Sequence, residues 1–367
     1  MGLFSRKDDA VVEQIRSAVL DVLDPSLDVP LRALGAEPRI DYRKGHAAIE
    51  LVLPYPARGV AAEFTARIGE ALRAVEAVQR VDVELAFDVP IGAVQGKQAP
   101  MPEVRNIIAV ASGKGGVGKS TTAVNLALAL AAEGARVGLL DADIYGPSQP
   151  RMVGSQAQPS TQDGQSMQPV EALGLQTMSI GYLVAEDNPM IWRGPMVTSA
   201  LMQLLNETRW QGLDYLVVDM PPGTGDVQLT LAQKVPVAGA VIVTTPQDIS
   251  LIDARKGLKM FEKVNVPVLG IVENMSLHIC SNCGHVEHIF GEGGGARMAA
   301  ESDVPLLGAL PLDGRIREQA DSGHPTVAAD PEGQVAGLYR QIARRMAARL
   351  VLAGGEDEGF PSIVIED

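Results

Sequence analysis

Hydrophobic and polar residues in the first ninety positions follow two different periods. Apolar side chains three or four positions apart predict helices, and short apolar or alternating runs predict strands. The elements predicted in this way are helices over 9–23 and 60–76 and strands over 47–53 and 80–87. The first helix is expected to end at Asp24, because the residue before a proline disfavours helical backbone. We therefore predict a small α+β domain over residues 1–88.

The pattern changes after this domain, where short, continuous apolar runs alternate with helical stretches. The runs predict strands at 106–112, 136–141, 215–220, 239–245 and 266–272. Such strands, separated by helices, are typical of a mostly parallel sheet with helices on both faces. We predict an α/β domain of this kind over residues 104–353. Residues 89–103, rich in proline and glycine, predict a linker, and the acidic residues 354–367 predict a flexible tail.

Residues 113–120 read GKGGVGKS and fit the pattern of a phosphate-binding loop. The predicted strand 106–112 precedes this loop and an apolar helix at 120–132 follows it, as the pattern requires. Glycines allow backbone N–H groups to turn towards a phosphate, and the helix N-terminus adds a partial positive charge. Lys119 would reach the β- and γ-phosphates, and Ser120 would offer its hydroxyl to Mg²⁺. The loop therefore predicts a nucleotide site.

Four charged residues extend this site. Lys114 is either a solvated surface charge or a lysine that reaches the phosphates of a nucleotide held by a facing subunit. Asp219 ends a predicted strand, where a carboxylate can hold Mg²⁺ through water. Asp141 and Asp143 end another strand. One of them could touch the metal and the other could orient the attacking water, although both could instead cap a turn.

Both cysteines of the chain lie in one short segment, as Cys280 and Cys283 in a C-x-x-C pair. Such a pair can be a redox couple, half of a zinc site or half of an iron–sulfur site. Three of the five histidines, His278, His285 and His288, flank it and could complete a zinc site within one chain. A site of four cysteines would instead need a second chain, most simply a symmetric dimer with both pairs on its axis.

Composition limits the classes of function. The net charge of −14 argues against non-specific binding of nucleic acid, because phosphate backbones are repelled. Two cysteines in 367 residues argue against a disulfide-built secreted protein, and no signal-peptide pattern or membrane-length apolar run is evident. The arginine-rich stretch 339–353 could be a membrane-binding helix, but an acidic tail follows it, which favours a helix docked on the sheet. We expect a cytoplasmic protein without stable membrane association.

The phosphate-binding loop, the strand-end aspartates and the C-x-x-C pair lie in segments where the chain closely resembles the Mrp/ApbC group of iron–sulfur cluster carrier ATPases. This group belongs to the MinD/ParA-type P-loop NTPases. The resemblance rests on ASGKGGVGKST (111–121), LLDADIYGPSQPRMVG (139–154), MIWRGPM (190–196), YLVVDMPPGTGDVQLTL (215–231), TTPQDISLIDARKGLKMF (244–261) and ENMSLHICSNCGH (273–285). Residues 9–87 resemble the small iron–sulfur assembly domain often fused ahead of this ATPase, with DPSLDVPLRALGA (24–36) as the matching stretch. Relatives of that domain often carry a cysteine after the central strand, whereas LVLPYPARGVAAEF (51–64) has none.

The resemblance implies a role for each matching position. Lys114 matches the signature lysine, Asp143 the residue that positions water, and Asp219 the metal-site aspartate. Asn274 lies where the wider class contacts adenine. Cys280 and Cys283 match the pair that bridges a [4Fe–4S] cluster between two subunits. The ATP-binding loop comprises Gly113, Lys114, Gly115, Gly116, Val117, Gly118, Lys119, Ser120 and Thr121.

Residues and resemblance together predict a homodimeric ATPase, whose hydrolysis can be slow, that uses ATP, Mg²⁺ and a [4Fe–4S] cluster. Lys114, Lys119 and Asp143 are its expected catalytic residues, and Ser120 and Asp219 its expected Mg²⁺ ligands. It would receive the cluster from an iron–sulfur assembly scaffold and pass it to apo-proteins. The alternatives are a MinD/ParA-like positioning ATPase and a zinc-binding ATPase scaffold.

Overall fold

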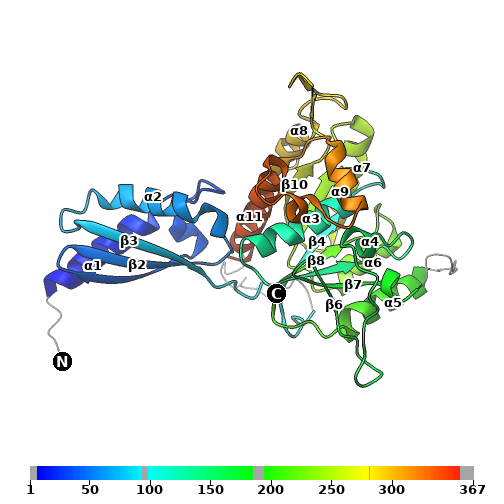
Figure 1. Ribbon diagram of the computed structural model, residues 1–367, viewed down its shortest axis with the longest axis horizontal. Helices are drawn as coiled ribbons and strands as arrows, with labels where there is room; N and C mark the ends of the chain where they lie inside the picture. Colours follow the sequence, from blue (N-terminus) through cyan, green and yellow to red (C-terminus); the bar gives the residue numbers. More distant parts are fainter. Residues whose placement is uncertain (1–5, 93–97, 185–193, 281, 356–367) are drawn as a thin grey trace, which may run out of the picture. The chain divides into compact units, whose positions relative to one another are not determined.

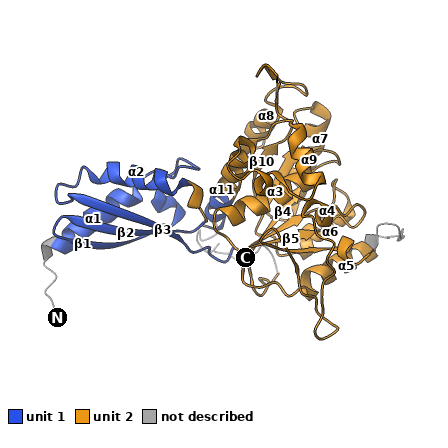
Figure 2. Cartoon of the chain, in the orientation of Figure 1, with its two compact units in different colours: residues 1–55, 60–93, 347–367 blue, residues 56–59, 94–346 orange. Residues whose placement is uncertain are grey.

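The computed structural model describes residues 6–92, 98–184, 194–280 and 282–355. The chain divides into two compact units, coloured separately in Figure 2. The first comprises residues 1–55, 60–93 and 347–367, and the second comprises residues 56–59 and 94–346. Parts of the expected linker and most of the expected acidic tail lie outside the described residues.

The first unit is a three-stranded sheet with two helices. Its elements are α1 (Arg6–Leu20), β1 (Glu37–Arg43), β2 (His46–Leu53), α2 (Ala61–Leu72) and β3 (Arg80–Phe87). In the sheet order β1-β2-β3, β1 runs antiparallel to β2 and β2 runs parallel to β3. Alternate residues of β2 are buried, because one face packs on the core that contains Phe64 and Ile68 of α2.

A buried carboxylate shapes the turn after α1, which ends at Leu20 rather than beside Asp24 as the sequence predicted. Asp24 is fully buried, and its Oδ1 accepts hydrogen bonds of 2.8 Å from the backbone N–H groups of Ser26 and Leu27. The hydroxyl of Tyr55 donates to the other oxygen. Burial raises the pKa of Asp24. The chain therefore leaves the helix early to form this hydrogen-bonded turn.

The second unit is built on an eight-stranded sheet, in the order β13-β10-β9-β4-β8-β5-β7-β6 (Figure 1). All neighbouring strands are parallel except β6 and β7. This confirms the mostly parallel sheet. The strands are β4 (Val104–Ala111), β5 (Val137–Asp141), β6 (Val170–Ala172), β7 (Leu175–Ser179), β8 (Leu213–Asp219), β9 (Gly239–Thr244), β10 (Val268–Glu273) and β13 (Leu306–Ala309).

Helices cover both faces of this sheet. They are α3 (Lys119–Ala132), α4 (Gln149–Met152), α5 (Gly194–Glu207), α6 (Asp226–Lys234), α7 (Asp248–Lys263), α8 (Gly294–Glu301), α9 (Gly314–Asp321), α10 (Thr326–Ala329) and α11 (Gln334–Gly355). Ile107 and Ala109 of β4 share a core with residues of α5 to α8, while the alternate Ile108 and Val110 are also buried. Because successive strand residues point to opposite faces, both faces are covered. Within the described ranges, no helix is long and apolar enough to cross a membrane.

Glu133, at the end of α3, is a fully buried carboxylate held by two arginines of α11. Its Oε1 accepts from Arg340 Nε at 2.9 Å and from Arg344 Nη1 at 2.6 Å. The guanidinium groups are themselves mostly buried. Removing the carboxylate would leave two desolvated cations without their counter-charge.

We therefore expect Glu133→Ala to lower the free energy of unfolding by about 3–5 kcal/mol. Glu301→Ala, which removes an exposed ion pair with Arg255 from the same unit, is the matched control and should cost at most about 1 kcal/mol. Denaturant unfolding monitored by circular dichroism measures both values. Equal effects of the two substitutions would contradict the buried role of Glu133.

Candidate functional site

The loops with chemistry all leave the sheet at one edge. Parallel strands β4, β5, β8 and β10 end there, and each is followed by a segment singled out in the sequence. The glycine-rich loop follows β4, Asp141 ends β5, Asp219 ends β8 and Asn274 follows β10. Ligands of open α/β sheets bind at this carboxyl edge. The structure therefore gathers residues that are up to 160 positions apart in the sequence, such as Lys114 and Asn274.

The glycine-rich loop connects β4 to α3 in a conformation that needs glycine. Gly116 and Gly118 both have a φ of 82°, which side-chain-bearing residues rarely adopt. A Cβ on Gly118 would also collide with the amide of Asn274, whose Nδ2 donates to Val117 O at 2.9 Å. The other end of the loop, at Gly113, packs directly on the backbone of α7 at Asp253. Asn274, expected beside adenine, thus bonds to the loop itself.

Lys119 and Asp219 form an ion pair at the first turn of α3. Both side chains are buried, and Lys119 Nζ also lies 3.1 Å from Ser120 Oγ. The other oxygen of Asp219 accepts a hydrogen bond of 2.8 Å from Gln149 Nε2. The expected phosphate-binding lysine, the expected metal-site aspartate and the expected metal-binding hydroxyl are therefore neighbours.

The two carboxylates after β5 have different surroundings. Asp141 is fully buried and accepts from the backbone N–H groups of Asp143, Ser148 and Gln149 at 3.0–3.1 Å. Burial, and then the nearby charge of Asp219, raises its pKa to about 7. Asp143 is less buried, and burial also raises its pKa. Asp141 therefore organises the segment that follows β5, and Asp143 is the carboxylate of this segment that is open to a ligand.

Lys114 lies in the loop one position after Gly113. Its side chain is half-buried, and its backbone carbonyl accepts from Ser112 Oγ at 2.8 Å. In the described part of the chain its ammonium group forms no ion pair. The charge is thus available to a group outside the chain.

Cys280 and Cys283 lie at the tip of a small hairpin formed by β11 (His278–Ile279) and β12 (Val286–Glu287). The turn is closed by Cys280 N donating to His285 O at 2.9 Å and Gly284 N donating to Cys280 O at 2.8 Å. Cys283 is exposed and Cys280 is partly exposed. Ile279, Val286 and Ile289 of the same hairpin region are 44–49% exposed, so apolar surface surrounds the thiols.

The flanking histidines do not gather around the cysteines. The ring Nδ1 of His278 lies 3.0 Å from Leu312 O, and that of His288 lies 3.1 Å from Ser276 O. Among the described residues, no cluster of three or more histidine, cysteine or acidic side chains could hold a metal ion. The two thiols are the metal-binding groups that this hairpin presents together.

Hydrogen bonds to the sulfur hold the pKa of Cys280 below its usual range. They come from the backbone N–H groups of Asn282 and Cys283 and from the Cys283 thiol. Because the thiolate is the reactive form, Cys280 should react with iodoacetamide at a lower pH than free cysteine. Cys283→Ala removes one donor and should move the midpoint for Cys280 upward, whereas Cys283→Ser should move it less. Rates followed by mass spectrometry against pH measure this, and a midpoint above that of free cysteine would contradict it.

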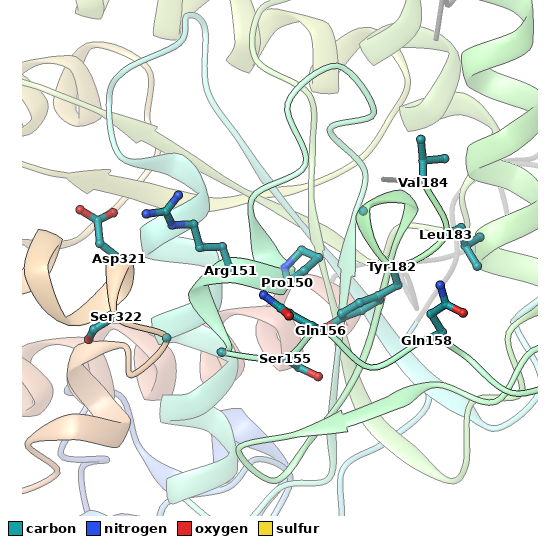
Figure 3. Close-up of a pocket in the computed structure, with 13 residues that line it drawn as sticks. Pro150, Arg151, Ser155, Gln156, Gln158, Tyr182, Leu183, Val184, Asp321 and Ser322 are labelled. Atoms are coloured by element: carbon teal, nitrogen blue, oxygen red, sulfur yellow. The ribbon is translucent and has the colours of Figure 1, made fainter. Parts of the chain in front are cut away.

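Neither Gln149, the first residue of α4, nor the cavity beside that helix could be singled out from the sequence. The cavity has a volume of about 710 Å³. Pro150 and Arg151 of α4 and Tyr182 are among the residues that line it (Figure 3). Gln156 also lines it, whereas Gln149 does not. A run of small and polar residues after a strand is typical of many loops, so no local signal marks either feature.

Two known protein families match separate parts of this chain. Residues 103–347 match the family described as "NUBPL iron-transfer P-loop NTPase", and residues 12–85 match "Iron-sulfur cluster assembly protein". An "Iron-sulfur cluster carrier protein" of Escherichia coli K12 is 51% identical over 351 residues, covering 95% of each chain. The "Iron-sulfur cluster transfer protein NUBPL" of Mus musculus is 54% identical over 256 residues, covering 69% of this chain and 80% of that protein.

Among solved structures, a nucleotide-binding protein from Archaeoglobus fulgidus in complex with ADP is 36% identical, with a TM-score of 0.55. The match covers 63% of this chain and 90% of that one. The sheet, the glycine-rich loop and this likeness define the class: a P-loop NTPase. Within that class, the chain belongs to the iron–sulfur cluster carrier family, with an iron–sulfur assembly-type domain ahead of the NTPase.

Proposed function

We propose that this chain is an ATP-hydrolysing carrier that binds a [4Fe–4S] cluster between two copies of itself and passes it to apo-proteins. One observation carries the proposal. The hairpin that presents Cys280 and Cys283 begins shortly after Asn274, whose amide bonds to the phosphate loop at Val117. A ligand in that loop and a ligand on the thiols would therefore act on the same short segment.

The residues at the sheet edge fit Mg²⁺ and ATP. Gly116 and Gly118 have the positive φ that would let the loop backbone turn around a phosphate, and Asn274, which bonds to that loop, would contact the base. Ser120 and Asp219 supply the hydroxyl and carboxylate oxygens that Mg²⁺ prefers. When bound, Mg-ATP would supply a transferable phosphoryl group. The full loop, Gly113 to Thr121, would wrap the phosphates.

Three side chains would perform the hydrolysis. Lys119 would leave Asp219 for the β- and γ-phosphates, because the negative charge there is greater and Asp219 gains the metal in exchange. Asp143 would hold the attacking water, since it is the open carboxylate of its segment. Lys114 would stabilise the charge that develops on a nucleotide held by the other copy.

The cluster is the cargo, and each chain provides two of its four thiolates. The pKa of Cys280 lies below that of an ordinary thiol, so the thiolate forms more readily, which favours binding of iron. Since the hairpin tip is exposed and edged by Ile279 and Val286, two tips can meet on a two-fold axis. ATP and the cluster would then both shift the equilibrium between separate chains and the dimer. Hydrolysis would therefore change how tightly the cluster is bound.

We further propose that residues 1–88 form a docking module of the assembly type and that residues 104–353 carry the ATPase and the cluster. An iron–sulfur assembly scaffold would be the donor and apo iron–sulfur proteins the recipients. The acidic net charge supports a carrier without nucleic-acid partners. We propose that it acts in the cytoplasm without stable membrane association.

Cluster transfer to an apo-ferredoxin tests this function. The cluster-loaded chain is mixed with the acceptor in the presence of Mg-ATP, Mg-ADP or no nucleotide, and the acceptor's visible circular dichroism is followed. The proposal predicts transfer in all cases with a rate that depends on the nucleotide. One common rate would contradict the coupling, and stoichiometric zinc with no cluster after anaerobic reconstitution would favour a zinc-binding scaffold.

A further inference from the structure

Gln149 joins the segment after β5 to both halves of the expected metal site. Its Nε2 donates to Asp219 Oδ2 at 2.8 Å and to the backbone carbonyl of Ser120 at 3.1 Å. Its backbone N–H donates to Asp141. The side chain is 1% exposed, so these bonds are made away from water. A single residue thus connects the ends of β5 and β8 and the first turn of α3.

The orientation of the amide is fixed by chemistry. Asp219 Oδ2 and the carbonyl of Ser120 are both acceptors, so the NH₂ group must face them and the carbonyl oxygen must point away. The reverse orientation would set Oε1 against two oxygens. Gln149 Oε1 therefore points away from these two oxygens, and as a carbonyl oxygen it can only accept hydrogen bonds.

This oxygen finds no donor. Gln149 Oε1 is buried and has no hydrogen-bond partner among the described residues, and the same holds for Ser148 Oγ immediately before it. A buried polar atom without a partner costs about 1–3 kcal/mol, so native proteins rarely leave one unless a ligand or water fills the place. The two residues are adjacent in the chain, and both of their backbone N–H groups donate to Asp141 Oδ2. The arrangement calls for a ligand that brings hydrogen-bond donors.

A hydrated Mg²⁺ ion has this property. It keeps several of its waters when it binds to protein, and each water has two O–H groups that donate hydrogen bonds. Asp219 would hold one such water, because a carboxylate at a strand end can hold Mg²⁺ through water. Gln149 Oε1 and Nε2 are bonded to the same carbon atom. Because Nε2 lies 2.8 Å from Asp219 Oδ2, Oε1 is also close to this carboxylate.

We propose that Gln149 is a positioning residue of the nucleotide site, whose Oε1 accepts a hydrogen bond from a Mg²⁺-bound water that Asp219 would also hold. Through its backbone bond to Asp141, it makes the conformation of the segment that carries Asp143 depend on the metal. The inference rests on the proposed function, because it presupposes that Mg-ATP binds at this loop.

Binding of a fluorescent, N-methylanthraniloyl derivative of ATP to the full chain, with and without Mg²⁺, tests the inference. Mg²⁺ should strengthen binding to the wild-type chain. Gln149→Met, of similar length but without the amide donor and acceptor, should reduce that Mg²⁺-dependent gain by about tenfold and leave the Mg²⁺-free affinity nearly unchanged. Gln156→Met, at an exposed position of the neighbouring cavity, is the matched control and should bind as the wild type does.

Gln149→Glu keeps an acceptor but loses the Nε2 donor and sets a second carboxylate against Asp219, a repulsion that a bound metal would relieve. Its Mg²⁺ dependence should therefore be steeper than that of the wild type. Losses in both variants, or a Mg²⁺ dependence unchanged in both, would overturn the inference while leaving the proposed function in place. Absence of nucleotide binding by the wild-type chain would overturn the proposed function, and the inference with it.

Discussion

Replacing Cys280 or Cys283 with alanine is expected to abolish cluster retention. Each substitution removes two of the four thiolates of a symmetric dimer, and the described part of the hairpin brings no third metal-binding side chain close to them. Iron and acid-labile sulfide, measured after anaerobic reconstitution and desalting, should fall to background. The broad visible absorption of the cluster should disappear with them.

His285→Ala is the matched control for the cysteine variants. His285 lies in the same turn and its side chain is exposed, while its backbone carbonyl, which closes the turn, is retained. This variant should keep the full iron and sulfide content. If a cysteine variant kept the cluster, or His285→Ala lost it, the thiol pair would not be the site.

Lys114→Ala is expected to lower the rate constant of ATP hydrolysis by about 10³-fold or more, as the loss of an arginine finger does. Binding of ATP should change little, because the loop backbone and Lys119 remain. Steady-state phosphate release and equilibrium nucleotide binding separate the two effects. Lys256→Ala, which removes an exposed lysine paired with Asp253, should leave both unchanged.

A mixing experiment shows whether Lys114 acts on its own nucleotide or on that of the other copy. Lys114→Ala and Asp143→Ala chains should each be inactive alone. A mixed dimer has one site with both an intact Asp143 and a partner's intact lysine, and its other site has neither. Because about half of the dimers in an equal mixture are mixed, the mixture should recover about a quarter of wild-type activity. No recovery on mixing would mean that Lys114 acts within its own subunit.

Motifs with a continuous local pattern could be predicted from the sequence. The alternation over 80–87 gave β3 with its observed bounds, and the loop at 113–120 lies between a strand and a helix as expected. In β1, by contrast, Pro38 is the only buried residue, and Arg39, Asp41 and Arg43 are exposed. The strand therefore has no apolar run from which it could be predicted. Short strands such as β13, with four residues, carry too few positions for a period to show.

The environment of the nucleotide site could be predicted only in part. Sequence placed Lys119 and Asp219 at strand and helix ends, and folding pairs them across 100 positions. It could not show that Asn274 bonds to the loop or that Gln149 bonds to Asp219, because these contacts depend on strand order and on side-chain direction. A glutamine in a short helix has many exposed counterparts, and only burial distinguishes this one.

The proposed function depends most on two copies of the chain sharing one inorganic core. The direct measurement is the molar mass of the anaerobically reconstituted protein by light scattering, with iron and sulfide determined on the same fraction. We predict that the metal-loaded species is a dimer with about four iron and four sulfide ions, and that Cys280→Ala yields no loaded dimer. A metal-loaded species that is strictly monomeric would contradict the account.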